Sequence, residues 1–443
     1  QKIAIIGAGP AGLSCAFYLA EKGYKPVVFE KNERPGGMLT YGIPSFKLQK
    51  DVIEAEVEVI RLMGAEFRYG VEVGRDVTLD ELRAQGFKAF YVAIGCQGGR
   101  LAGIPGEDAE DVIVAVDFLR EVNSGKIDAL PGRTIVVGGG NVAIDVARNA
   151  CRLGSEHVEM FCLESEVKMP ASEEERREAV EDGAHISCGW GPKEVHLDEA
   201  GRVCGITFKR CTRVYDDEGR FAPEYDENDL RRVDADRVVM SIGQSIVWGD
   251  LLAGSKVELG RGQGALADPQ TYQTAEPDIF VGGDVYTGPS FAIDAIAAGH
   301  EAAVSIHRFV QPGSTLTIGR NQRRYTALDR NDVVLESYDN ASREVAHVDR
   351  EREKAAPFSE YVETFTEEQV RAETARCLGC GASIVDPNKC IGCGLCTTKC
   401  AFDAIHLDRD RPECSTMVKY EQKLPSLGKY ALKRAIKIKF GKK

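Results

Sequence analysis

The sequence contains neither a long hydrophobic run nor an excess of positive charge, and each absence argues against a class of protein. No apolar stretch approaches the roughly 20 residues that a membrane-spanning helix requires, so no transmembrane segment is expected. The formal net charge of -13 over 443 residues argues against a nucleic-acid partner, because binding to phosphates requires a basic face. The chain is therefore predicted to be soluble, and its length suggests about three domains.

Nucleophile motifs and a secretion signal are also missing. The seven histidines are scattered, and none lies in a recognisable nucleophile motif. The apolar segment Lys2–Ile6 leads directly into a glycine turn, so no signal peptide is expected before it. Because the sequence starts at Gln1 rather than at Met, we expect it to be trimmed upstream.

The fourteen cysteines are placed in a way that suits metal binding better than disulfides. Seven of them lie between Cys377 and Cys414, several separated by only two residues, and this spacing favours metal thiolates. No C-x-x-C or C-x-x-x-x-C pair occurs before this segment, which argues against a disulfide reductase. The cysteine usage predicts a reducing, cytoplasmic location.

Residues 390–400 carry four cysteines in the spacing C-x-x-C-x-x-C-x-x-x-C of bacterial ferredoxins, in which thiolates hold a 4Fe–4S cluster. Structural zinc is the main alternative, although zinc rarely uses such closely spaced steps. Ala401 replaces the usual proline, and seven thiolates cannot fill the eight positions of two clusters, so one cluster is expected and a second stays open. The candidate metal ligands are Cys377, Cys380, Cys390, Cys393, Cys396, Cys400 and Cys414.

A first dinucleotide motif follows the apolar segment Lys2–Ile6 and opens a helical pattern. In G-x-G-x-x-G, Gly7 makes the tight turn, Gly9 lets the backbone approach a pyrophosphate, and Gly12 allows close helix packing. Glu30 ends the next predicted strand, where its carboxylate can accept both ribose hydroxyls. The whole context predicts a dinucleotide site.

A second motif of the same kind, residues 138–143, follows another short apolar strand. Glu164 comes just past the next strand, and a carboxylate there favours a free ribose 2′-hydroxyl over a 2′-phosphate. We therefore expect NAD(H) in preference to NADP(H). In the alternative interpretation Glu164 is a surface acid, and Lys168 or Arg176 sets the preference.

Together with these loops, the segments GGMLTYGIPSFKL at residues 36–48 and GGD at residues 282–284 resemble the glutamate synthase small-subunit family. Relatives of that family include flavin subunits of electron-bifurcating transhydrogenases and the reductase half of dihydropyrimidine dehydrogenase. The resemblance covers roughly residues 1–310 and implies FAD in the first site and a nicotinamide nucleotide in the second. It also implies that Asp284 contacts the flavin and that Ala297 lies on a helix approaching the isoalloxazine.

The sequence departs from that family in two places. An N-terminal iron–sulfur domain is usual there and is not seen here, and arginines often stand where Leu163 and Glu164 stand. The residues expected to bind the two cofactors are Gly7, Gly9, Pro10, Ala11, Gly12, Glu30, Lys31, Gly36, Gly37, Met38, Leu39, Gly42, Ile43, Pro44, Gly95, Gly138, Gly140, Asn141, Val142, Ala143, Glu164, Gly243, Gly283, Asp284 and Ala297.

The predicted fold is α/β, with two Rossmann-like domains, the NAD domain being inserted in the FAD domain, and a small α+β ferredoxin-like iron–sulfur domain. The expected boundaries are 1–104 with 265–310 for FAD, 105–264 for NAD(P), 311–375 for a connecting arm, 376–414 for the iron–sulfur domain and 415–443 for a basic tail. The tail is expected either to be solvated or to dock an acidic partner or an anionic membrane.

These features predict an FAD-dependent NAD(P)H oxidoreductase with no catalytic acid or base of its own, since hydride passes directly between cofactors. The expected role is that of an electron-transfer subunit whose partners are other iron–sulfur or flavin subunits. A more specific form of this role is electron bifurcation at the FAD. The alternatives are a self-contained ferredoxin–NAD(P) reductase, a glutamate synthase small subunit proper, and a scaffolding subunit with a retained fold.

Overall fold

The computed structural model describes residues 1–320, 341–377, 390–399, 405–407 and 419–440. They form two compact units, the first made of Gln1–Ser337 with Glu344–Thr366 and the second of Tyr338–Arg343 with Glu367–Lys443. Within the described residues, no helix combines the length and the apolar character needed to cross a membrane.

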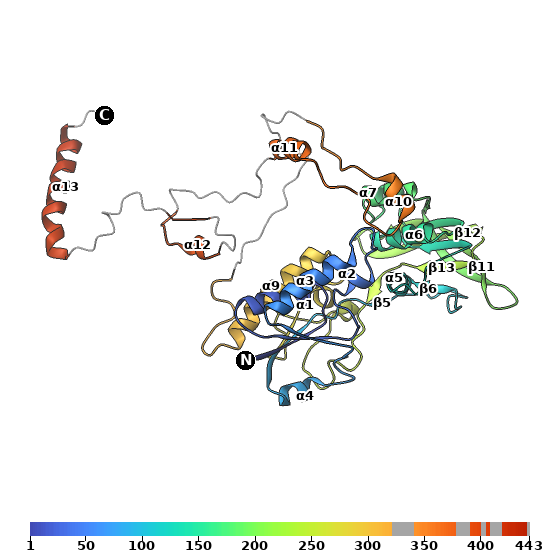
Figure 1. The fold of residues 1–443 in the computed structure, drawn as a ribbon, viewed down its shortest axis with the longest axis horizontal. Coiled ribbons are helices and arrows are strands. Elements are labelled where there is room, and N and C mark those ends of the chain that lie inside the picture. Colours follow the sequence, from blue (N-terminus) through green and yellow to red (C-terminus); the bar gives the residue numbers. More distant parts are fainter. Residues whose placement is uncertain (321–340, 378–389, 400–404, 408–418, 441–443) are drawn as a thin grey trace. The chain divides into compact units, whose positions relative to one another are not determined.

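A five-stranded parallel sheet forms the base of the first unit (Figure 1). Its strands, in sheet order, are β15 (Ile279–Val281), β4 (Phe87–Val92), β1 (Lys2–Ile6), β2 (Val27–Glu30) and β3 (Glu66–Tyr69). Successive side chains of β1 point to opposite faces, so Ile3 and Ile5 join one buried cluster while Ala4 and Ile6 join another. Both faces are covered, which explains why the strand is apolar throughout.

Helices α1 (Pro10–Glu21), α3 (Lys50–Leu62) and α9 (Ala292–Phe309) lie side by side on one face of this sheet (Figure 1). Helix α4 (Leu79–Ala84) lies on the other face, where its Leu79 and Leu82 are buried. Thr78 and Glu81 close the start of α4 with a reciprocal capping box. The first glycine motif is thus fixed between a strand and a helix that are both packed.

A second parallel sheet carries the other glycine motif. Its order is β6 (Val112–Val114), β13 (Arg237–Met240), β7 (Arg133–Val137), β8 (His157–Cys162) and β9 (His185–Cys188). One face is covered by α5 (Ala115–Asn123) and α6 (Asn141–Arg152), with α7 (Glu173–Glu181) beside α6. The other face is covered by an antiparallel sheet of β10 (Trp190–Leu197), β11 (Val203–Tyr215) and β12 (Phe221–Val233).

Two short antiparallel strands carry the chain between the domains: β5 (Gly98–Gly99) leads out of the first and β14 (Gln244–Ser245) leads back. After β14, Trp248, Leu251 and Val257 pack against the first sheet. The sequence analysis placed residues up to 264 in the second domain, so the structure moves that boundary by about twenty residues. These apolar side chains lie in irregular backbone, where hydrophobic residues do not recur with a helical or strand period. The sequence therefore held no periodic pattern that could assign them to the first domain.

Part of the expected connecting arm is folded against the first unit. Residues 347–363, named the strap here, are closed by a bridge between Val348 and Val362 and contain α10 (Arg350–Ala355). Tyr361 of the strap is only 6% exposed, and Phe358 packs on the core beneath α6. This part of the arm therefore belongs to the first unit as a packed element.

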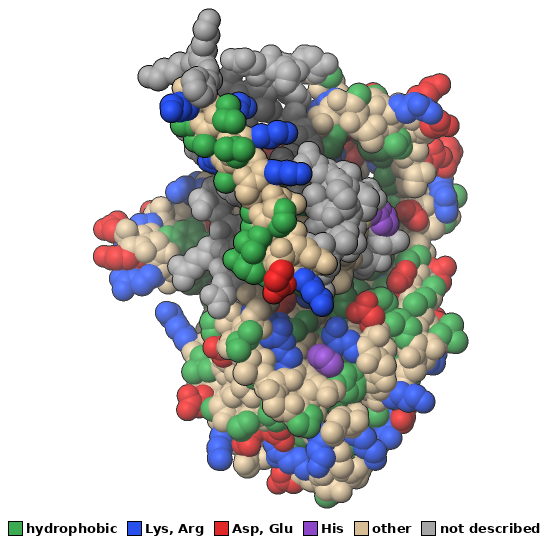
Figure 2. Space-filling model, turned by 90° about the vertical axis from the view of Figure 1, so that its left-hand side faces the viewer, with side chains coloured by type: hydrophobic (Ala, Val, Ile, Leu, Met, Phe, Trp, Pro, Cys, Tyr) green, Lys and Arg blue, Asp and Glu red, His purple; other side chains and the backbone are tan. Residues whose placement is uncertain are grey.

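The second unit contains three described helices: α11 (Glu367–Ala375), α12 (Leu395–Lys399) and α13 (Tyr420–Phe440). Helix α13 spans most of the expected basic tail, and hydrophobic side chains such as Tyr430 and Ile438 are exposed along it. Figure 2 shows hydrophobic side chains interleaved with those of Lys and Arg along this helix. The part of the tail within Tyr420–Phe440 is thus helical, whereas the sequence analysis assigned it no element.

The contact between α1 and α9 predicts a test of the fold. A Cβ atom at Gly299 would lie 2.2 Å from the carbonyl oxygen of Ala11 and 2.8 Å from Cβ of Ser14. Gly299→Ala is expected to destabilise the protein by ~1–3 kcal/mol, because both helices must separate. Gly428→Ala, in α13 with nothing within 4 Å, is the matched control. Equal thermal unfolding midpoints for the two variants would contradict this packing.

Candidate functional site

A cavity of about 620 Å³ lies where the two domains of the first unit face each other. The first domain contributes the glycine turn at residues 7–11, the segment at residues 37–43, and Asp284. The second contributes Asn141, Val142 and Asp145 from the start of α6. The volume lies within the usual range for small-molecule sites, so both glycine motifs open onto one site of suitable size.

The first glycine motif has the close contacts that its sequence predicts. Gly7 has φ of +102°, and a Cβ atom there would lie 2.4 Å from the carbonyl oxygen of Ala93. A Cβ atom at Gly12 would lie 2.0 Å from the carbonyl oxygen of Gly7. Gly9 caps α1 and Pro10 takes the first helical position, where a missing N–H costs nothing. The free N–H groups and the positive end of the helix dipole are thus available to a phosphate.

Glu30 is held in place by hydrogen bonds before any ligand arrives. Its side chain is nearly buried, and Oε2 accepts a bond of 2.8 Å from the Ala8 N–H. Oε1 accepts bonds of 2.9 and 2.6 Å from the backbone and side chain of Asn32. A carboxylate offers about four acceptor sites, so capacity remains for the hydroxyls of a ribose at the cavity wall.

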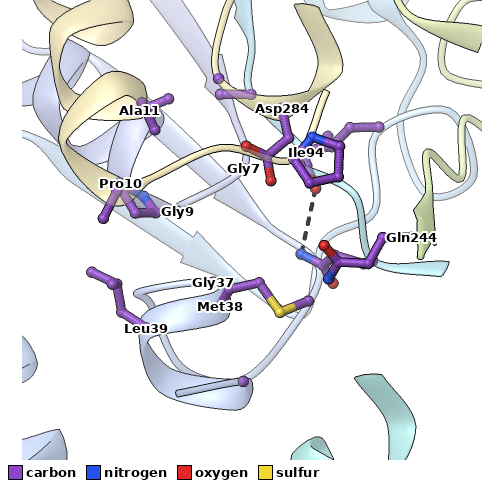
Figure 3. Close-up of a pocket in the computed structure, with 18 of the residues that line it drawn as sticks. Gly7, Gly9, Pro10, Ala11, Gly37, Met38, Leu39, Ile94, Gln244 and Asp284 are labelled. Carbon is purple, nitrogen blue, oxygen red and sulfur yellow. Dashed lines mark hydrogen bonds between the residues drawn. The ribbon is translucent and has the colours of Figure 1, made fainter. Parts of the chain in front are cut away.

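Another part of the wall is formed by Gly37, Met38, Leu39, Gly42 and Ile43, and Figure 3 shows the first three. Gly37 has φ of +55°, and a Cβ atom there would lie 2.9 Å from Cα of Gly9. The two glycine segments therefore touch through bare backbone. Helix α2 (Met38–Tyr41) follows and places Met38 and Leu39 toward the cavity.

Asp284 reaches the cavity from the first turn of α8 (Asp284–Thr287) (Figure 3). Its preceding Gly283 has φ of +67°, and a Cβ atom at Gly282 would lie 2.3 Å from Oη of Tyr91. Burial raises the pKa of the Asp284 carboxyl above its ordinary value. The glycine pair thus allows a sharp turn that presents a partly desolvated carboxylate at the site.

The second glycine motif is built in the same way. Gly138 has φ of +145°, and a Cβ atom there would lie 2.2 Å from the carbonyl oxygen of Ser241. Gly140 caps α6, and Asn141 and Val142 of its first turn line the cavity. Ala143 is fully buried in the core behind them, as a residue in the third glycine position should be.

Glu164 lies outside this cavity, in an adjoining one of about 480 Å³ next to the second glycine motif. A Cβ atom at Gly139 would lie 3.1 Å from Oε2 of Glu164, which places the carboxylate against the loop. Lys168, Arg210 and Arg213 line the same cavity. Both an acid and basic side chains are therefore present where the adenosine end of a nucleotide would extend from this loop.

The sequence analysis did not assign a role to Lys47, Asp145 and Glu175, which meet at the cavity. The Lys47 ammonium lies 2.6 Å from Oδ1 of Asp145 and also pairs with Glu175. Burial raises the pKa of Asp145 to about 6. Burial also lowers the pKa of Lys47, but the two neighbouring carboxylates raise it by more, so the pKa of Lys47 is raised overall. In the sequence, Lys47 appeared only within the family segment at residues 36–48, and no local pattern could pair it with acids from another domain.

Several predicted residues do not line the cavity. Ala297 is exposed, while Ala292 and Ala295 of the same helix line it. Ala292 and Ala295 are three residues apart and share a helical face, from which Ala297 points away. The others that shape backbone or packing without lining the cavity are Gly12, Gly36, Pro44, Gly138, Gly140, Ala143 and Gly243. Lys31, Gly42, Ile43 and Gly95 do line it.

Four of the predicted metal ligands are described, and all are exposed: Cys377, Cys390, Cys393 and Cys396. Gly392 and Gly394, between them, have φ of 66° and 77°, which turns the backbone sharply at each step. In the described part of the chain no three potential ligands come together as a metal site. Three thiols at two-residue gaps with glycines between them fit the donor chemistry of a 4Fe–4S cluster. Cys380, Cys400 and Cys414 lie outside the described residues.

Two Rossmann-like domains whose glycine motifs open on one cavity define the class of two-dinucleotide flavin oxidoreductases, and the comparisons identify the family. Residues 1–299 match the family Pyridine nucleotide-disulphide oxidoreductase, to which this chain belongs. Residues 383–406 match the 4Fe-4S binding domain. The chain is thus an oxidoreductase that binds FAD and NAD(P) and carries a 4Fe–4S domain, which confirms the predicted fold class and cofactors.

Curated relatives support the resemblance seen in the sequence. The Escherichia coli glutamate synthase [NADPH] small chain is 36% identical over 70% of this chain and 69% of its own length. The NADP(+)-dependent formate dehydrogenase subunit beta of Moorella thermoacetica is 36% identical over 86% of this chain. This chain spans 54% of that relative, about half its length.

Solved structures agree on the fold. FprA from Mycobacterium tuberculosis superimposes with a TM-score of 0.60 over 70% of this chain and 84% of its own, at 19% identity. Thioredoxin reductase from T. acidophilum gives a TM-score of 0.52 over 69% of this chain and 97% of its own, also at 19% identity.

The pKa of Asp145 predicts how the site responds to pH. As the pH falls through about 6, Asp145 takes up a proton and loses the charge that faces Lys47. We expect flavin reduction by a nicotinamide nucleotide to slow below that pH, and Asp145→Asn to be slower without this transition. Stopped-flow rates between about pH 5 and pH 8 measure it. Asp117→Asn, an exposed acid on α5, is the control, and an unchanged transition in Asp145→Asn would refute the assignment.

Proposed function

We propose that this chain is the electron-transfer subunit of a larger enzyme, in which it exchanges hydride between NAD(H) and FAD and passes single electrons to iron–sulfur centres. The observation that carries the proposal is the shared cavity, onto which both glycine motifs open. A cysteine run that matches a 4Fe-4S binding domain on the same chain supplies the next carrier. A flavin accepts two electrons together and releases them one at a time, which suits it to this junction.

The residues of the cavity would bind and orient the cofactors instead of taking or giving protons in the reaction. The start of α1 and Glu30 would hold the pyrophosphate and ribose of FAD, and Asp284 would hold its flavin end. The start of α6 would hold the pyrophosphate of the nicotinamide nucleotide. Lys47, placed between Asp145 and Glu175, would keep the second domain against the first while the rings meet.

Partner subunits fit this role better than a self-contained reductase does. Three of the curated relatives are named as a formate dehydrogenase subunit beta, a glutamate synthase small chain and an NADPH-Fe(3+) oxidoreductase subunit beta. We infer a partner with iron–sulfur or flavin centres for this chain too. Reduction of ferredoxin that depends on a second acceptor would reveal electron bifurcation, and efficient reduction by the isolated chain would favour the self-contained alternative.

Replacing one cluster ligand should separate the two halves of the electron path. In Cys393→Ser a thiolate is lost, so we expect less bound iron and at least about a ten-fold slower reduction of ferredoxin, while flavin reduction by NADH changes less than about two-fold. Cys204→Ser, an isolated cysteine far from the run in sequence, is the matched control. Unchanged ferredoxin reduction in Cys393→Ser would show that electrons leave the flavin by another path, and the proposal would fail.

The nucleotide preference that we propose is for NADH. Glu164 stands against the second glycine loop, where its charge would repel a 2′-phosphate and its oxygens could accept from a 2′-hydroxyl. Two basic residues of the same cavity are already engaged: Arg213 pairs with Glu224, and the Arg210 guanidinium lies 5.1 Å from the ring centroid of Trp190. Lys168 lines the same cavity as well, and we assign the nucleotide preference to Glu164 because its carboxylate lies against the glycine loop.

Glu164→Gln tests this preference. Removing the negative charge should raise kcat/KM for NADPH relative to NADH by about ten-fold, as measured by steady-state flavin reduction with each nucleotide. Glu166→Gln, a second acid lining the same cavity, is the control and should leave the ratio unchanged. A wild-type protein that already reacts faster with NADPH would overturn the assignment.

A further inference from the structure

The strap, residues 347–363, is a defined element rather than a loose linker. The Asp349 N–H donates to the carbonyl oxygen of Tyr361 at 2.9 Å, and the Glu363 N–H donates to that of His347 at 2.8 Å. Asp349 also caps α10 by accepting from the Arg352 N–H at 3.0 Å. The two ends of the strap are therefore held side by side, and its middle is presented to α6.

The strap is held to the second domain by two arginines of α6. Arg152 donates to the carbonyl oxygen of Pro357 and to Oε1 of Glu353, both at 2.6 Å. Arg148 donates to Oη of Tyr361, also at 2.6 Å, and both arginines bond to Asp182. Their side chains are 1% and 5% exposed, so these bonds are shielded from water and stronger than surface pairs.

The strap also reaches the first domain through the aromatic ring of Phe46. The rings of Phe358 and Phe46 have centroids 6.4 Å apart, and the Gln49 amide donates to the carbonyl oxygen of Phe358 at 3.3 Å. The Arg152 guanidinium lies 4.2 Å from the centroid of Phe46. Phe46 is 4% exposed, so the first domain, α6 and the strap meet around one buried ring.

Phe46 immediately precedes Lys47, whose ammonium pairs with Asp145 at the cavity. Asp145, Arg148 and Arg152 are spaced by three and four residues along α6, so one helical face holds both Lys47 and the strap. A shift of Phe46 would therefore move Lys47 along that face.

We propose that the strap is a positioning element for hydride transfer: by packing on Phe46 it keeps Lys47 in place and the nicotinamide-binding domain docked on the FAD domain. The inference rests on the proposed exchange of hydride between the two cofactors. No strap residue lines the cavity, so the strap acts through Phe46 and Lys47. Phe358 is the residue expected to matter most, since it supplies the ring that contacts Phe46.

Phe358→Ala in the full chain, loaded with FAD, tests the proposal. We expect the limiting rate of flavin reduction at saturating NADH to fall about ten-fold, because the rings lose their alignment, while FAD content and the Kd for NADH stay within about two-fold. Phe358→Leu should restore most of the rate, since it retains an apolar contact with Phe46. Glu351→Gln, which changes an exposed acid of α10 in the same strap, is the control and should leave the rate unchanged.

A second set of measurements distinguishes positioning from simple stabilisation. If Phe358→Ala lowers only the thermal unfolding midpoint and leaves the limiting rate unchanged, the strap is a structural brace and the proposal is wrong. If the strap acts through Lys47, flavin reduction in the double variant Phe358→Ala with Lys47→Met should be little slower than in Lys47→Met alone. Fully additive losses of rate in the double variant would refute a route through Lys47. A wild-type protein whose flavin no nicotinamide nucleotide reduces would overturn the proposed function itself, which is a different result.

Discussion

The ion pairing of Lys47 with Asp145 and Glu175 joins the two nucleotide-binding domains at the cavity onto which both glycine motifs open. The covalent connection alone cannot fix their orientation, because β5 and β14 are each only two residues long. Contacts across the cavity must therefore do so. Burying charges carries a desolvation penalty, which the raised pKa of Asp145 reflects, so this contact is held less firmly than an apolar interface of the same size would be.

Because burying these charges carries a cost, Lys47 must be held in position by the residues around it. Phe46 is enclosed by Arg148, Arg152 and Phe358, and Gln49 bonds to the carbonyl oxygen of Phe358. A strained or mobile loop could not keep an ammonium group between two carboxylates, whereas a loop anchored on both sides can. The strap thus compensates for a domain contact whose charges carry a cost.

The sequence predicted those parts of the site that are encoded locally. Gly7, Gly12 and Glu30 lie within one strand–turn–helix–strand unit, so their spacing alone determined the turn, the helix packing and the position of the acid. Lys47 and Asp145 are 98 residues apart, and their pairing depends on how two domains dock, which no local pattern records. Ala297 was expected on a helix and lies on α9, but it points away from the cavity because a choice of face requires knowledge of what packs against it.

The position of the strap in the chain gives its packing a wider consequence. After residue 366 the chain passes into the unit that contains the cysteine run, so the strap is the last packed element of the first unit before the iron–sulfur segment in the sequence. Within the first unit, the strap contacts Phe46, which immediately precedes Lys47. In the function that we propose, this order would place the element that positions the flavin end directly before the segment that carries the iron–sulfur ligands.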